Sequence, residues 1–129
     1  MKAVVIIPPV FDFYYTPHRS SGLGAKIVLG LLLEKGFTAR LLDFPGRANK
    51  KVKNQTLPRD LDYVRPFLVE HETGKTSFFN QYKRFGPCLE ECVRQTLATG
   101  PDVIFISCFA FCYAQTALDL AQQIRQSDP

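Results

Sequence analysis

The stretch Ala3-Val4-Val5-Ile6-Ile7-Pro8-Pro9 decides the fold of this 129-residue chain. Five consecutive apolar residues, most of them β-branched, are typical of a strand buried on both faces, as in parallel sheets. The two prolines end the strand because proline has no N–H to donate to a ladder. Phe37–Phe44 alternates well enough to predict a second strand, and Asp102–Ser107 is a third buried run.

Helical patterns separate these strands. Ser20 or Ser21 can cap a helix that runs to Lys35, with Gly36 as its C-cap. A second stripe has apolar residues at steps of three and four, which indicates a helix: Phe78, Tyr82, Phe85, Leu89, Val93 and Leu97. Gly86-Pro87 interrupts this stripe, so we expect two helical pieces, the second opened by Pro87. A final helix is predicted with an inner face of Ala114, Ala117, Leu118, Ala121 and Ile124.

The alternation of strands and helices predicts an α/β fold with an open parallel sheet and right-handed crossovers. The length fits a single domain over residues 1–129, with an irregular basic insertion at about 46–77. Three strands make a narrow sheet, and the helix Gly22–Leu33 is apolar nearly all round. Both features favour a chain that is incomplete at its C-terminus or that a partner completes. A homo-oligomer is left open.

Charge and composition exclude several classes of protein. The net charge of +4 comes from Pro45–Pro66, which has six basic and two acidic residues. No aromatic residues alternate with these cations and no known reader motif is present, so we expect a solvated loop and no nucleic-acid partner. The longest apolar stretch, Gly22–Leu33, has only twelve residues and includes Lys26, which predicts no membrane span. The four cysteines do not resemble a disulfide framework and no signal peptide is visible, so we expect a cytoplasmic protein with reduced thiols.

Ligands of open parallel sheets bind beyond the carboxyl ends of the strands, which here are Pro8–Ser21, Asp43–Arg47 and Ser107–Tyr113. The first segment is far longer than a strand-to-helix turn requires. It is also rich in aromatic, polar and charged side chains, namely Phe11, Asp12, Phe13, Tyr14, Tyr15, Thr16, His18 and Arg19. This composition predicts a ligand site, although packing against a neighbouring domain would also account for the aromatic residues.

Several short motifs occur in a recognisable order: Pro8-Pro9, Thr16-Pro17-His18-Arg19, Gly22-Leu23-Gly24 with its helix, and Pro101–Ser107 followed by the helix Ala114–Arg125. Their order and spacing resemble the N-terminal cobalamin-binding domain of cobalamin-dependent radical-SAM enzymes. The resemblance covers nearly the whole chain outside Gly46–Ser77. It implies a flavodoxin-like (Rossmann-like) domain whose strand ends pack against the corrin ring of cobalamin. It also implies a missing C-terminal catalytic domain that uses S-adenosylmethionine and an iron–sulfur cluster for methyl transfer or another radical reaction.

The resemblance implies two groups of cofactor-binding residues. Tyr14, Tyr15, Thr16, Pro17, His18 and Arg19 follow the first strand, and Ser107, Cys108, Phe109 and Phe111 follow the third. Cobalamin proteins that bind cobalt through histidine carry Asp-x-His-x-x-Gly, whereas this chain has Thr16 and Ser21 at the Asp and Gly positions. Since no carboxylate fixes the imidazole tautomer, we expect His18 to make a polar contact or to be a buried, hydrogen-bonded histidine, and no metal ligand is predicted.

Other motifs fail on inspection. Cys108 and Cys112 are spaced like the start of a radical-SAM cluster motif, but Gln115 occupies the third cysteine position. No nucleophile–base set is visible, so we expect no catalytic residue in this chain. Two alternatives remain open. A flavodoxin-like FMN binder would need a phosphate loop directly after the first strand, which Pro8–Tyr15 matches poorly. A non-binding interaction domain would use the aromatic loop as an interface.

Overall fold

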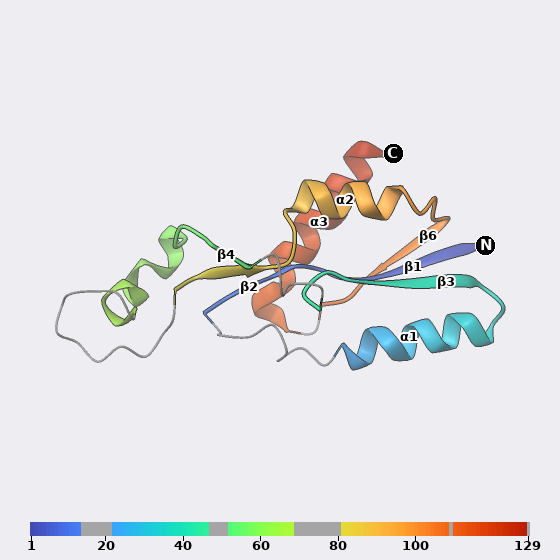
Figure 1. The fold of residues 1–129 in the computed structure, drawn as a ribbon, viewed down its shortest axis with the longest axis horizontal. Coiled ribbons are helices and arrows are strands. Elements are labelled where there is room, and N and C mark those ends of the chain that lie inside the picture. Colours follow the sequence, from blue (N-terminus) through green and yellow to red (C-terminus); the bar gives the residue numbers. More distant parts are fainter. Residues whose placement is uncertain (14–21, 47–51, 69–80, 109, 129) are drawn as a thin grey trace.

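A computed structural model describes residues 1–13, 22–46, 52–68, 81–108 and 110–128. These residues form an α/β fold with one three-stranded parallel sheet and one three-stranded antiparallel sheet (Figure 1). The elements in chain order are β1 (Lys2–Ile7), β2 (Val10–Asp12), α1 (Leu23–Glu34), β3 (Thr38–Asp43), β4 (Val52–Asn54), the 3-10 helix η3 (Arg59–Phe67), β5 (Lys83–Phe85), α2 (Leu89–Leu97), β6 (Val103–Ile106), the 3-10 helix η4 (Phe111–Tyr113) and α3 (Ala114–Ser127).

The parallel sheet has the strand order β3-β1-β6, with β1 in the centre. Lys2 pairs with Thr38 in β3, and Ala3 pairs with Val103 in β6. Residues 3–7 of β1 are all buried, which confirms that this apolar run is the middle of the fold. The sequence therefore predicted all three parallel strands, each to within about two residues at its ends.

Helices cover both faces of the parallel sheet. Val5 and Ile7 pack against α1 through Ala25, Val28 and Leu29. The alternate side chains of β1 point to the other face, because successive residues of a strand point in opposite directions. That face packs against α2 and α3, in a core formed by Val4, Ile6, Leu42, Phe44, Cys92, Val93, Leu120 and Ile124.

Helix α1 ends as the sequence predicted but starts later. Gly36 has φ +81°, and the N–H of Phe37 donates to the carbonyl of Leu32, which closes the helix in the manner of a glycine C-cap. At the other end, Gly22 is the N-cap with φ 58°, and Ser20 and Ser21 lie outside the described residues. A Cβ at Gly22 would lie 2.8 Å from the Cδ1 of Ile7, so this position requires glycine.

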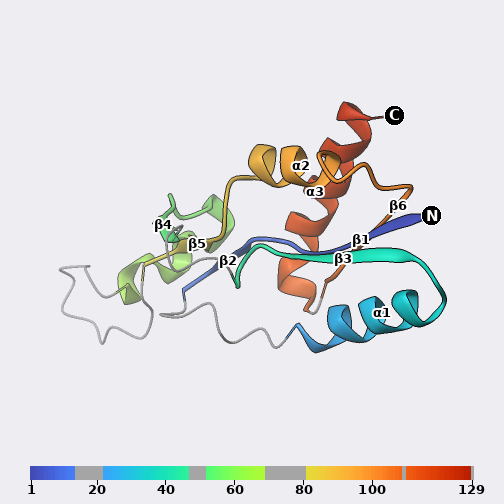
Figure 2. The same ribbon diagram turned by 45° about the vertical axis from the view of Figure 1, so that its right-hand side comes forward.

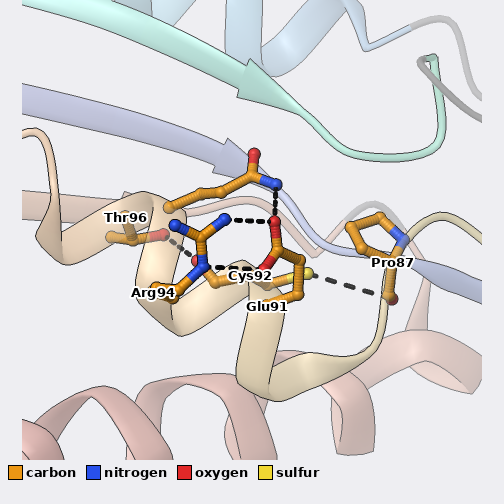
Figure 3. Close-up of polar contacts among 6 residues, drawn as sticks. Pro87, Glu91, Cys92, Arg94 and Thr96 are labelled. Atoms are coloured by element: carbon orange, nitrogen blue, oxygen red, sulfur yellow. Dashed lines mark hydrogen bonds and ion pairs between the residues drawn. The ribbon is translucent and has the colours of Figure 1, made fainter.

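Helix α2 begins at Leu89 with Cys88 as its N-cap, so Pro87 lies just outside the helix rather than opening it. Its polar contacts are shown in Figure 3. The buried hydroxyl of Thr96 donates to the carbonyl of Cys92 at 2.8 Å, and Glu91 accepts from Arg94 on the surface. The exposed ion pair contributes at most about 1 kcal/mol, whereas the buried hydroxyl must be paired to be tolerated.

The predicted first helical piece is wrong. Lys83–Phe85 is strand β5, which pairs antiparallel with β2 on one side and β4 on the other. Phe78 lies outside the described residues, and the described part of this piece, Tyr82 and Phe85, is not helical. The insertion is also less irregular than predicted, since it contains β4 and η3.

The inner face of α3 is rotated from the prediction. Leu118 is 63% exposed, whereas Leu120 is fully buried beside Ile124. All four cysteines are free thiols, and Cys108 and Cys112 are exposed. Within the described ranges, no helix has both the length and the apolar character needed to cross a membrane.

Candidate functional site

The strand order identifies the carboxyl ends of β1 and β6 as the place to look for a ligand site. The chain leaves β1 toward α1 on one face, whereas it leaves β6 toward α3 on the other. Neighbouring strands whose connections leave to opposite faces form a topological switch point, where ligands of open α/β sheets bind. The hydrogen bond from the N–H of Ser107 to the carbonyl of Ile6, at 2.8 Å, holds the two strand ends together.

A small antiparallel sheet extends the molecule beyond these carboxyl ends. Figures 1 and 2 both show β2, β4 and β5 on the side of β1 opposite the N-terminus. The order is β2-β5-β4, and the chain enters it directly from β1 through Pro8 and Pro9. Gly86 ends β5 with φ +117°, and a Cβ there would lie 3.2 Å from the carbonyl oxygen of Phe44, so glycine allows the two sheets to approach closely.

A hydrogen bond joins the segments that follow β1 and β6. The hydroxyl of Tyr113, in η4, donates to the Oδ2 atom of Asp12, in β2. Tyr113 also packs against the buried pair Val10 and Phe85. The segments that follow β1 and β6 are therefore held together by contacts among β2, β5 and η4.

Aromatic side chains gather on one face of the small sheet. The ring of Tyr82 lies 5.1 Å from that of Phe13 and 6.3 Å from that of Phe11, measured between centroids. Phe11 and Phe13 alternate along the chain, so they point to the same side. Arg84 and Lys53 stand in register with Phe11 across the three strands. Rings and cations thus share this face.

A pocket of about 490 Å³ lies between this sheet, α2 and the start of α3. We call it the strand-end pocket. Its lining combines aromatic rings with amides, hydroxyls and carboxylates, namely Phe11, Gln55, Thr56, Pro58, Asp60, Leu61, Tyr82, Leu89, Cys112, Gln115, Thr116 and Asp119. The Nε2 of Gln115 donates to the Oδ1 of Asp119 at 2.7 Å, which orients both side chains one helical turn apart.

The electrostatics of the strand-end pocket are acidic. Asp60 and Asp119 are its charged residues, and no lysine or arginine is among the described residues that line it. Burial, and to a smaller degree the charge of Asp12, raise the pKa of Tyr82 above its ordinary value. The phenol therefore stays neutral and can donate a hydrogen bond at physiological pH.

The structure describes only part of the sequence-predicted site. Tyr14, Tyr15, Thr16, Pro17, His18, Arg19 and Phe109 lie outside the described residues. Ser107 is half-buried at the end of β6, and the thiol of Cys108 donates to the carbonyl of Ala110 at 3.3 Å. Phe111 is 94% exposed, so its ring is available to a ligand. Ser107, Cys108 and Phe111 do not line the strand-end pocket. Of the two segments predicted to bind a ligand, Pro8–Ser21 contributes Phe11 to the lining and Ser107–Tyr113 contributes Cys112.

Sequence reasoning missed most of the pocket. The apolar spacing places Tyr82 on a helix, and Gln55 and Asp60 lie in the insertion, where the sequence predicts no element. Thr116 and Asp119 lie on the polar side of α3. Polar residues are expected on that side of any amphipathic helix, so they do not indicate a ligand site. In the described part of the chain, no group of three or more His, Cys, Asp or Glu side chains could hold a metal ion.

Two other pockets are less suited to a ligand of the sheet. A pocket of about 350 Å³ adjoins the strand-end pocket and shares Gln55, Thr56 and Tyr82 with it. A groove of about 380 Å³ runs between β6 and the second half of α3, and Pro101 and Asp102 place it toward the amino end of β6. Because open α/β sheets bind ligands at the opposite end of their strands, the strand-end pocket is the better candidate.

Comparison with known proteins does not assign the chain to a family. It matches no protein-family model, and no curated protein or solved structure is significantly similar to it. A function must therefore be inferred from the residues and geometry at the strand ends.

Proposed function

We propose that this chain is a cobalamin-binding module, with the corrin ring lying across the carboxyl ends of β1 and β6. The strand order β3-β1-β6 is that of the first three strands of a flavodoxin-like sheet, in which the cofactor lies at this switch point. The observation that carries the proposal is the strand-end pocket, whose lining combines aromatic rings with hydrogen-bonding side chains.

The pocket lining fits the chemistry of a corrin. A corrin is a wide, mostly apolar ring whose rim carries amide side chains, so its site needs apolar contact together with both donors and acceptors. Within the lining, the rings of Phe11 and Tyr82 offer apolar contact, and outside it the exposed ring of Phe111 offers more at the strand ends. Asp60 and Asp119 can accept hydrogen bonds from amide N–H groups, and the lining amides and hydroxyls can donate to amide carbonyls. When bound, cobalamin would supply a cobalt centre able to carry a methyl group.

The same lining disfavours FMN. The phosphate of FMN carries close to two negative charges, and two carboxylates beside it would repel it. No described lining residue is a cation that could offset this repulsion. Cobalamin has only one phosphodiester charge, which the positive charge on cobalt offsets, so it tolerates an acidic pocket better.

The proposal extends to the protein of which this module would be part. A catalytic domain outside this chain would bind S-adenosylmethionine and an iron–sulfur cluster, and the reaction would take place there in a cytoplasmic enzyme. The residues of this chain would bind and orient the corrin and exclude water from its lower face.

The test is retention of cobalamin. The protein is mixed with hydroxocobalamin, passed through a desalting column, and its visible spectrum is recorded, with FMN treated identically. We expect corrin absorbance to remain with the protein and flavin absorbance to be lost. Retention of FMN but not of cobalamin would replace this proposal with the flavodoxin-like alternative, and retention of neither would overturn it.

Two variants locate the site. Phe111→Ser removes an exposed ring at the strand ends and should weaken cobalamin binding about tenfold, since a well-placed aromatic contact contributes about 1.4 kcal/mol. Tyr63→Ser removes another exposed ring, 74% accessible and located in η3, and should leave binding unchanged. Equal effects of the two variants would contradict the proposed placement.

A further inference from the structure

Helix α1 presents an apolar surface on the side that faces away from the sheet. Leu23, Ile27, Leu31 and Leu33 are each more than half exposed. Figures 1 and 2 show α1 against the parallel sheet on one side, with no other described element on its opposite side. Ala25 is the only residue of this helix that is fully buried. About half of the surface of Ile27, Leu31 and Leu33 is therefore left uncovered by the described residues.

The exposed residues of α1 follow the spacing of a helix–helix seam. Leu23, Ile27, Gly30 and Glu34 are spaced by four, three and four residues, so they share one narrow strip of the helix surface. Lys26, Leu31 and Leu33 flank this strip. We call these seven residues the α1 seam. An apolar strip with this spacing is suited to a second helix rather than to a small molecule or a flat surface.

Gly30 lies in the middle of the seam without a role in the packing of its own chain. A Cβ added at this position would meet nothing within 4 Å, so no neighbouring atom requires a glycine there. Glycine in the interior of a helix is unfavourable because it gains no side-chain contacts and loses more backbone freedom than other residues. It does allow a second helix backbone to approach closely, as at the crossing points of paired helices.

The charges of the seam complement those of a second copy. Lys26 and Glu34 lie one helical turn to either side of Gly30, about 6 Å away along the axis in each direction. Both are exposed, and neither forms a salt bridge within the described part of the chain. Two copies of α1 crossing antiparallel at Gly30 would place Lys26 of each chain opposite Glu34 of the other. A parallel pair would instead place like charges opposite each other.

We propose that the chain forms a two-fold symmetric homodimer through the α1 seam, with the helices antiparallel and crossing at Gly30. The interface is isologous, as in most homodimers, because one surface supplies both the apolar knobs and the charges that complement them. Ile27 and Leu31 of each copy pack beside the paired glycines. This assembly leaves the strand-end pocket open, because α1 and the pocket involve different residues.

The first test is sedimentation velocity of the full chain over a range of protein concentrations, without cofactor. We expect a reversible monomer–dimer equilibrium. Gly30→Leu should abolish the dimer because the side chain separates the helices at their crossing point. Gly24→Leu is the matched control, since Gly24 also has nothing within 4 Å but lies outside the seam.

Charge reversal tests the antiparallel register. Lys26→Glu and Glu34→Lys should each weaken the dimer roughly tenfold, because each replaces two symmetry-related attractions by repulsions. The double variant Lys26→Glu/Glu34→Lys should regain the wild-type dissociation constant. Circular dichroism of every variant verifies that α1 remains folded.

Three outcomes would overturn the proposal. These are a monomer at every concentration, a dimer that no seam variant weakens, and a double charge reversal that does not recover the wild-type affinity. The last would exclude the antiparallel pairing even if a dimer exists. None of these measurements uses cobalamin, so a failure here is distinct from a failure of the proposed cofactor function.

Discussion

The hydroxyl of Tyr82 lies in an environment that penalises ionisation. Its ring packs with Phe11 and Phe13, and Asp12 brings a negative charge near the phenol. Burial is the larger cause and the Asp12 charge the smaller, and both raise the pKa of Tyr82 above about 10. The folded protein therefore binds this proton more tightly than the unfolded chain does.

Tyr82 is consequently expected to limit stability in alkali. Its contribution is fully present below about pH 10 and is lost as pH rises through the raised pKa of the folded state. Tyr82→Phe should flatten the alkaline fall in the free energy of unfolding, measured by urea denaturation at a series of pH values. Tyr63→Phe removes a tyrosine from an exposed site and serves as the control. An identical alkaline fall in Tyr82→Phe and wild type would contradict the expectation.

Helix α3 illustrates how a neighbouring element sets which face of a helix is buried. Its sequence contains two leucines two positions apart, and either can belong to an apolar stripe together with Ile124. Packing against α2 and the sheet buries Leu120 and leaves Leu118 exposed. Alanines lie on both sides of these leucines, so the sequence does not show which side of α3 faces the core.

Alanine substitution of the two leucines is expected to give unequal costs. Leu120→Ala should lower the free energy of unfolding by about 2–5 kcal/mol, because it leaves a cavity in the main core. Leu118→Ala should change it by less than about 1 kcal/mol, since the side chain is already largely in water. Chemical denaturation of both variants measures the difference. Similar losses would mean that α3 is turned from its described orientation.

Elements with a continuous apolar run or a clear end signal were predictable, whereas short paired elements were not. The burial predicted for Asp102–Ser107 was wrong, because β6 is an edge strand with Phe105 exposed. The strands β1 and β6 are continuous apolar runs, and α1 has a clear glycine signal at its end, so local sequence determines them. Strands β2, β4 and β5 have three residues each, too few to show a period. Their conformation depends on pairing with segments that are distant in the sequence, so a local sequence pattern does not predict it.

The whole molecule is stabilised unevenly. Strand β1 has a hydrogen-bonded strand on each side and a layer of helix on each face, whereas all three residues of β4 are exposed. Local opening free energies follow burial and pairing of this kind.

Amide hydrogen exchange should therefore be graded along the chain. We expect Val5 and Ile6 to be among the slowest amides and to report global unfolding, and residues 52–54 to exchange much faster. Exchange followed by NMR or mass spectrometry measures this order. Equal protection of β1 and β4 would show that the two sheets open as one unit.

The neighbouring strand ends at which the candidate site was sought were predictable at the level of the whole molecule, but the residues that line the strand-end pocket were not. Alternating strands and helices located the carboxyl ends of β1 and β6, and the strand order confirms that these strands are neighbours. The strand-end pocket, however, combines side chains from β2, the insertion, the residue before β5, α2, η4 and α3. No single stretch of sequence contains enough of them to indicate a site.

The register that pairs Val10 with Phe85 has a consequence for the order of folding. Pairing of β1 with β3 joins Lys2 to Thr38 around α1, whereas pairing of β2 with β5 joins Val10 to Phe85, about twice as far apart along the chain. Long loops are closed late, because their entropy cost comes before the contacts that offset it. The strand-end pocket would then form only after the folding transition state. A ligand bound there would slow unfolding and lengthen the lifetime of the native chain while leaving its folding rate unchanged.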